Sequence, residues 1–92
     1  MLIDNESGVF RSKAVQWPGG PGLFHVTSVS NSHSVDLERL GSDGVTWVLL
    51  SSAFKIAANA VVNFDLDKCT LRADMAAGTD VFADIETRRY SP

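Results

Sequence analysis

Residues 35–50 read VDLERLGSDGVTWVLL, and this stretch decides the fold class. Its first part alternates apolar and charged side chains, which is the period of a strand with one buried face and one wet face. The GSDG segment at 41–44 supplies glycine and aspartate, residues that tolerate the positive φ of a tight turn. Residues 45–50 are β-branched, apolar and aromatic, with Trp47 near the centre. The stretch therefore predicts a β-hairpin around which the rest of the chain packs.

Similar alternation continues on both sides of the hairpin. Apolar and polar side chains alternate over residues 9–17, 23–30, 61–66, 69–75 and 81–90, with turn-forming residues between them. No long helical period separates these segments, so a parallel α/β sheet is disfavoured. We expect an all-β fold, a single antiparallel β-sandwich of immunoglobulin-like or Greek-key type with about seven short strands. The predicted core consists of Val26, Val35, Leu37, Trp47, Leu49, Val62, Phe64, Leu71, Ala73, Val81, Ala83 and Ile85.

The length of 92 residues is that of one domain. Residues 1–8 are mostly polar and predict a flexible N-terminal leader, and residues 9–90 predict the sandwich domain. The segment at 51–60 is the hardest to interpret. Phe54 and Ile56 fit either a short strand or plug residues beneath a loop, and we expect a turn centred on Asn59.

The composition argues against some classes of partner and indicates a cellular location. The formal net charge of −3 argues against a nucleic-acid partner, because such proteins need a basic surface. No apolar run approaches the roughly 20 residues of a membrane helix, and Met1 is not followed by a secretory leader. We therefore expect no membrane partner and assembly in a cytoplasm. The single cysteine, Cys69, leaves no intramolecular disulfide.

No catalytic or metal-binding pattern is visible. His25 and His33 stand outside any zinc-ligand spacing, and Cys69 has no histidine nearby in sequence. Asp65 and Asp67 share a strand end, but alternating acids on the wet face of strands usually serve solvation. A calcium-dependent adhesive sandwich stays an alternative. The sequence predicts a protein that is not an enzyme and uses no cofactor.

Four segments carry a resemblance to a known family. They are PGGPGLF at 18–24, SVDLERLGSDGVTWV at 34–48, ANAVVNFDL at 58–66 and LRA at 71–73. In order and character they resemble small β-sandwich virion proteins that tailed bacteriophages encode beside the major capsid protein. In that family a VxLxxL strand, a Gly/Asp turn and a TWV strand precede ANxxxxFxL and LRA strands. None of these segments is a catalytic motif.

The resemblance implies a capsid decoration or cement protein. Such a protein sits on the outer surface of the virion shell, bridges subunits of the major capsid protein and self-associates as a dimer or trimer. Many copies on a repeating lattice can each contribute a modest interface. The candidate contact residues are Leu2 and Ile3 in the leader, Trp17 and Phe54, and Arg88, Arg89 and Tyr90 in the tail. Trp17 precedes a proline and is held extended, and it suits an exposed anchor and a lid over the core equally.

The sequence also fits two other functions. A fibre or host-surface module that binds carbohydrate would need a cluster of exposed aromatic side chains with acids and amides, for which Trp17, Tyr90 and Asn31 are the candidates. A subunit of a tail or neck ring would instead form closed rings in solution.

Overall fold

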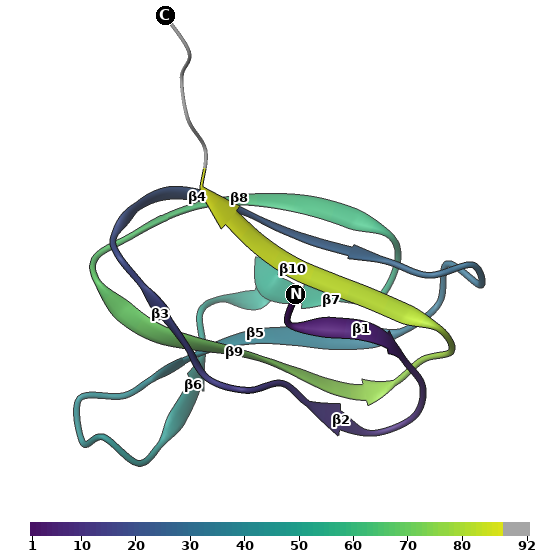
Figure 1. The fold of residues 1–92 in the computed structure, drawn as a ribbon, viewed down its shortest axis with the longest axis horizontal. Coiled ribbons are helices and arrows are strands. Elements are labelled where there is room, and N and C mark those ends of the chain that lie inside the picture. Colours follow the sequence, from purple (N-terminus) through teal and green to yellow (C-terminus); the bar gives the residue numbers. More distant parts are fainter. Residues whose placement is uncertain (88–92) are drawn as a thin grey trace, which may run out of the picture.

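The computed structural model describes residues 1–87 of the 92-residue chain (Figure 1). Nearly all the regular structure in this range is strand, with one short 3-10 helix, η1. In chain order the elements are β1 (Ile3–Glu6), β2 (Phe10–Arg11), β3 (Val15–Trp17), β4 (Gly20–Thr27), β5 (Ser34–Leu40), β6 (Trp47–Leu49), η1 (Ser52–Phe54), β7 (Lys55–Ile56), β8 (Ala60–Leu66), β9 (Cys69–Ala77) and β10 (Val81–Thr87). No helix within residues 1–87 is long and apolar enough to cross a membrane.

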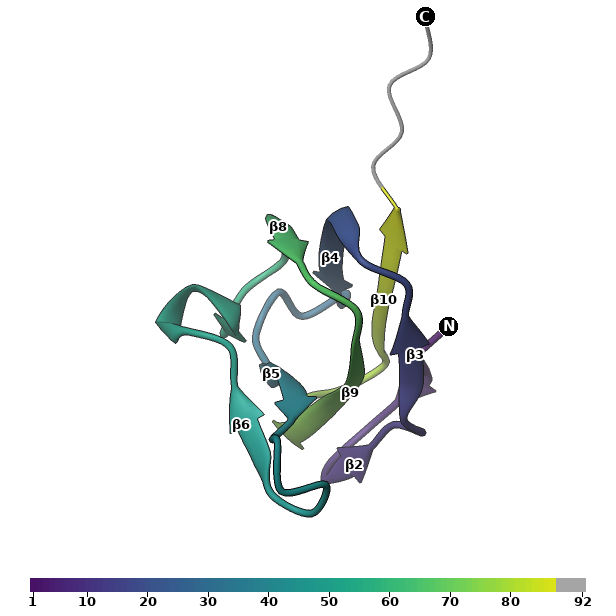
Figure 2. The ribbon, with the colours of Figure 1, turned by 90° about the vertical axis from the view of Figure 1, so that its left-hand side faces the viewer.

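The strands form two antiparallel sheets that pack face to face. Sheet A has the order β1-β10-β4-β8. Sheet B has the order β2-β9-β5-β6, with β3 also paired to β9 and β7 also paired to β5. Figure 2 shows the two layers, with β8, β4 and β10 above and β6, β5 and β9 below. The predicted fold class, an antiparallel β-sandwich, is confirmed.

The order of the strands is that of a jelly roll. β2 and β3 act as one interrupted strand because both pair with β9, and β6 and β7 act as another because both pair with β5. In the eight strands that result, the first lies beside the last in one sheet, and the second lies beside the seventh in the other. An immunoglobulin-like sandwich instead pairs its first two strands. The structure thus differs from the immunoglobulin-like prediction, and the short β1, β2 and β7 raise the strand count above about seven.

The core lies between the two sheets and is made by alternate residues of the long strands. Most of the residues predicted for it are buried: Val26, Val35, Leu37, Phe64, Leu71, Ala73, Val81 and Ala83. Leu49, Val62 and Ile85 are partly buried against it. The sequence prediction omits buried residues that come mainly from the chain start and from short elements: Leu2, Ile3, Trp17, Phe24, Phe54, Ile56 and Met75.

The prediction of a flexible leader over residues 1–8 is wrong for residues 3–6. These residues form β1, which pairs with β10 so that Ile3 lies opposite Ala83. The side chain of Ile3 is completely buried. The pairing is irregular between Ile3 and Glu6, and Asn5 takes a φ of 55° there. The strand was not predictable from the sequence, because Ile3 is its only buried residue and no apolar–polar alternation follows it.

The predicted hairpin is present, but the prediction of Trp47 as a core residue of the sandwich is wrong. β5 and β6 pair with Leu40 opposite Trp47, and residues 41–46 form the loop between them. The loop is closed by a hydrogen bond from the Gly41 N–H to the Thr46 carbonyl at 2.7 Å. The Trp47 ring lies half-buried beneath the Arg72 guanidinium, 4.3 Å from it. Arg72 alternates with buried neighbours on β9, so this stacked pair is on the outer face of sheet B.

The glycine-rich segment at residues 18–22 allows the Trp17 ring to be buried. Gly19 and Gly20 both take a φ near +100°, which turns the chain sharply after Pro18. The Trp17 ring then packs on Phe64 with ring centroids 4.9 Å apart. A Cβ on Gly22 would lie within 2.7 Å of atoms of both rings. Gly22 is therefore the residue that leaves room for the two aromatic side chains.

Candidate binding groove

The structure buries the contact residues that the sequence predicts near the chain start. Leu2, Ile3 and Trp17 all belong to the core, and Trp17 is only 3% exposed. The indole N–H of Trp17 donates to the Gly20 carbonyl at 3.4 Å. These side chains are therefore not freely exposed, and the burial of Trp17 fits the alternative of a lid over the core. Leu2 and Trp17 nevertheless line hollows at the surface, whereas Ile3 lines none.

Phe54 is buried as well, and its side chain belongs to the core. The helix η1 carries it under the edge of the sandwich, where its ring meets Phe64 edge-on at 6.1 Å. Ile56 follows in β7 and is also buried. Both interpretations of this segment are thus realised, the plug by Phe54 and the short strand by Ile56. The remaining predicted contacts, Arg88, Arg89 and Tyr90, lie outside the described residues.

The seam between the two sheets is open where β1 and β10 face β2 and β3. Two hollows lie along this seam, one of about 320 Å³ and one of about 370 Å³. They adjoin because Met1, Leu2 and Val15 line both, and we call them together the seam groove. The first hollow is completed by Gln16, Trp17, Pro18, Asp84, Ile85, Glu86 and Thr87, and the second by Asp4, Glu6, Phe10 and Lys13.

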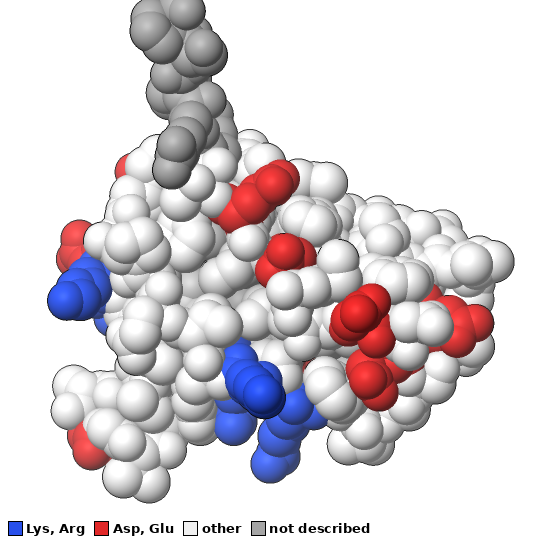
Figure 3. Space-filling model, viewed as in Figure 1, with Lys and Arg blue, Asp and Glu red and all other residues white. Residues whose placement is uncertain are grey.

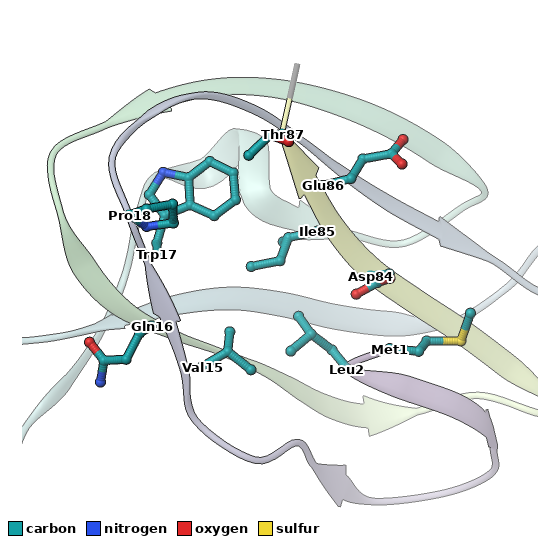
Figure 4. A pocket seen from close by; sticks show the side chains of 10 residues that line it. All are labelled: Met1, Leu2, Val15, Gln16, Trp17, Pro18, Asp84, Ile85, Glu86 and Thr87. Atoms are coloured by element: carbon teal, nitrogen blue, oxygen red, sulfur yellow. The ribbon is translucent and has the colours of Figure 1, made fainter. Parts of the chain in front are cut away.

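The floor of the seam groove is apolar. In Figure 4 the side chains of Leu2, Val15 and Ile85 point into the space between β3 and β10, and the Trp17 ring lies at its end. Val15 and Ile85 are partly buried hydrophobic residues packed against the core. The groove is therefore a place where the core of the sandwich reaches the surface through a gap between two sheet edges.

One rim of the seam groove is acidic. β1 contributes Asp4 and Glu6, and β10 contributes Asp84 and Glu86. Figure 3 shows the acidic side chains gathered over β10 and β1, with basic side chains below them. Lys13 lines the opposite rim. A chain segment that lies in the groove therefore finds a hydrophobic floor and a rim that attracts basic side chains.

The titratable groups within residues 1–87 do not assemble a reactive centre. No group of three or more His, Cys, Asp or Glu side chains in this range is placed to hold a metal ion. Cys69 is half-buried opposite Trp17, and burial raises the pKa of its thiol. A raised pKa disfavours the thiolate, the form that acts as a nucleophile.

The two histidines have structural surroundings. His33 is buried, and its ring nitrogens lie 3.2 Å from the Ile56 carbonyl and 3.3 Å from the Asn59 Oδ1. Asn59 also bonds the backbone of Ser28, accepting from its N–H and donating to its carbonyl. The predicted turn at Asn59 thus joins two loops far apart in sequence. His25 lies on the outer face of sheet A, opposite Asp84 on β10.

No protein-family model, curated protein or solved structure matches this chain. The seam groove therefore has to be interpreted from its own geometry. Sequence reasoning missed it because its floor is made by residues that are distant in the chain. The one available signal was the placement of apolar Leu2 and Ile3 before a run of polar residues, which we interpreted as an exposed contact.

Proposed function

We propose that this protein is a non-enzymatic virion structural protein, a capsid decoration protein that binds the outer shell and bridges subunits of the major capsid protein. The observation that carries the proposal is the seam groove, with its apolar floor at Leu2, Val15 and Ile85. The resemblance of the four segments between residues 18 and 73 to phage virion proteins supplies the identity of the partner. The jelly-roll order does not decide the matter alone, because the fold occurs in both viral capsid proteins and lectins.

In this proposal an extended segment of a capsid subunit binds along the length of the seam groove. Burial of the apolar floor by this segment would stabilise the complex by about 25 cal/mol per Å² of apolar surface removed from water. Basic side chains of the segment would lie along the acidic rim. Each such contact is modest, and many copies on the lattice add to a large total. Location on the virion and assembly in the host cytoplasm follow from this role.

The alternative of a carbohydrate-binding module lacks support among the described residues. Sugar-binding surfaces need exposed aromatic rings, but Trp17 is buried and Trp47 is covered by Arg72. Phe82 is the large aromatic side chain in residues 1–87 with substantial exposure. Nothing within residues 1–87 favours this function over shell binding.

The proposal is tested by co-sedimentation. Shells assembled from the major capsid protein encoded in the same genome are mixed with the full chain at micromolar concentration and pelleted. We expect the chain to pellet with the shells in a saturable manner and to be released by added salt, since the rim attracts basic groups. A chain that stays in the supernatant at all concentrations would count against the proposal.

A pair of matched variants tests whether the shell binds at the floor of the seam groove. Val15→Glu puts a charge on the groove floor, and Val45→Glu makes the same change at the exposed tip of the hairpin loop. We expect Val15→Glu to weaken shell binding by about tenfold or more, corresponding to roughly 1.4 kcal/mol. Val45→Glu should bind like the wild type. Thermal melting of both variants separates a loss of binding from a loss of folding.

The acidic rim has its own pair of variants. Glu86→Lys reverses a charge on the rim, and Asp67→Lys makes the same reversal at the exposed turn between β8 and β9. Only Glu86→Lys should weaken binding and reduce its dependence on salt. Equal effects from the two reversals would mean that net charge, and not the groove, controls binding.

A further inference from the structure

The four sheet edges of the sandwich differ in how well they are protected. β1 has four residues and an irregular pairing, and the edges made by β2 with β3 and by β6 with β7 are each split into pieces of two or three residues. Short, irregular edge strands are a common protection against unwanted pairing, as are lysine and proline. β8 has seven residues, AVVNFDL, with an unbroken register to β4. Its sequence contains neither lysine nor proline, so β8 is the least protected edge.

The register shows which backbone groups of β8 point outward. Pro21 lies opposite Asp65, and proline has no N–H to donate. That pair is therefore a non-hydrogen-bonded pair, and antiparallel pairs alternate between the two kinds. It follows that the N–H and C=O groups of Val61, Asn63 and Asp65 point away from β4. These groups are available to a further strand.

We propose that β8 pairs with β8 of a second copy of this chain, antiparallel, with the two-fold axis at Asn63. This is the register that overlaps all seven residues of the strand with all seven of its copy. Asn63 then faces Asn63, and Val61 faces Asp65, in hydrogen-bonded pairs that exchange about six backbone hydrogen bonds. The two four-stranded sheets A become one continuous sheet.

The side chains of β8 fit this register on both faces. On the inner face each copy places Val62 beside Phe64, so the partly exposed Val62 gains an apolar neighbour. On the outer face Asp65 meets Val61, which is 65% exposed in the single chain. A register centred on Asp65, or a parallel pairing, would place like charges opposite one another, which is destabilising. The inner-face pairing is completed by Ala60 with Leu66.

The position of β8 leaves the seam groove open. In sheet A, β8 forms one edge, and the groove lies at the other edge beside β1 and β10. The dimer therefore carries one groove at each end of its continuous sheet. The inference stands on the β8 edge alone and does not rest on the proposed function, although a unit with two grooves suits bridging.

The test is the molar mass of the full chain in solution, measured by sedimentation velocity from about 1 to 500 µM, because an interface this small is at the weak end of specific contacts. We expect a reversible monomer–dimer equilibrium. Asn63→Pro removes an outward N–H without removing a bond to β4, and Asn63→Ala keeps that N–H. Asn63→Pro should abolish the dimer, and Asn63→Ala should retain it.

A second measurement does not depend on a proline. In a Cys69→Ser background, Asn63→Cys brings two thiols to the two-fold axis, with Cα atoms about 5.5 Å apart, within disulfide range. Asp65→Cys is the matched control, because its two copies face Val61. Mild oxidation should convert the Asn63→Cys chain to a covalent dimer much faster than the Asp65→Cys chain.

Three results would overturn the inference. The first is a wild-type chain that stays monomeric over the whole concentration range, and the second is a dimer unaffected by Asn63→Pro in a variant that remains folded. The third is equal oxidation rates for the two cysteine variants. If the wild type is monomeric but Asn63→Pro loses shell binding, β8 accepts a strand of the shell protein and self-pairing is excluded. Failure of shell binding with an intact β8 dimer would overturn only the proposed function.

Discussion

Leu2 and Ile3 at the start of the chain are buried and the tip of the hairpin is exposed, whereas the sequence suggests a flexible leader and a central hairpin. Residues 1–6 look dispensable in the sequence, yet Ile3 is fully buried and β1 forms one side of the seam groove. Residues 41–46 belong to the stretch that decides the fold class, yet they form an exposed loop that bonds mainly to itself. Local turn chemistry thus identifies a loop clearly, but it carries no information on how much stability the loop contributes.

The two tryptophans give the largest expected contrast between these regions. Trp17 is packed on Phe64 in the core, whereas Trp47 is half-buried and stacked with Arg72 beside the hairpin loop. Trp17→Ala should reduce the free energy of unfolding by about 3–5 kcal/mol, the range for a buried aromatic side chain. Trp47→Ala should cost about 1 kcal/mol, mainly the cation–π contact. Urea unfolding of both variants makes the comparison, and equal costs would contradict the placement of Trp17.

Ile3→Ala tests directly whether the first strand belongs to the core. The variant removes a fully buried side chain opposite Ala83, and we expect it to cost about 2–5 kcal/mol. Val45→Ala, an exposed substitution at the hairpin tip, should change stability by no more than about 0.5 kcal/mol. If Ile3→Ala were as neutral as Val45→Ala, residues 1–6 would be a leader after all.

The smallest expected effect concerns the hairpin loop and depends on pH. Asp43 accepts hydrogen bonds from the Thr46 hydroxyl and from the backbone N–H groups of Thr46 and Val45, and these bonds lower its pKa from 3.8 to about 2. Because the pKa is lower in the folded state, the stabilisation is fully present above about pH 4 and is lost as the pH falls towards 2.

Asp43→Asn should therefore slightly lower the urea midpoint at pH 5 to 7 and converge with the wild type near pH 2. The comparison needs only denaturant titrations of the two chains at several pH values. A difference between the two chains that persists unchanged at pH 2 would show that the carboxylate charge is not the source of the stabilisation.

The predictable parts of the fold are the strands and turns that depend on residues close to one another in the sequence. The alternation of Val35 and Leu37, and of Leu71 and Ala73, is enough to assign the buried face of β5 and β9. Turn residues such as Asp43 mark the loops. These signals suffice for an antiparallel sandwich and for most of its core.

The rest depends on contacts between distant segments. The burial of Trp17 requires Gly22 and Phe64, and that of Ile3 requires β10, none of which is visible in a local pattern. The seam groove combines Leu2, Val15 and Ile85 for the same reason. The burial of Leu2, Ile3, Trp17 and Phe54 was not predictable, because an apolar side chain in a short or irregular segment suits a surface anchor and a core position equally well in sequence.

Hydrogen–deuterium exchange of the chain, free and bound to shells, tests the central claim that the protein binds its partner through the seam groove and not through the hairpin. The account predicts slower exchange on binding in peptides that cover residues 1–6, 13–18 and 84–87, with no change over 41–46. Slower exchange confined to the hairpin loop, with the groove segments unchanged, would contradict it.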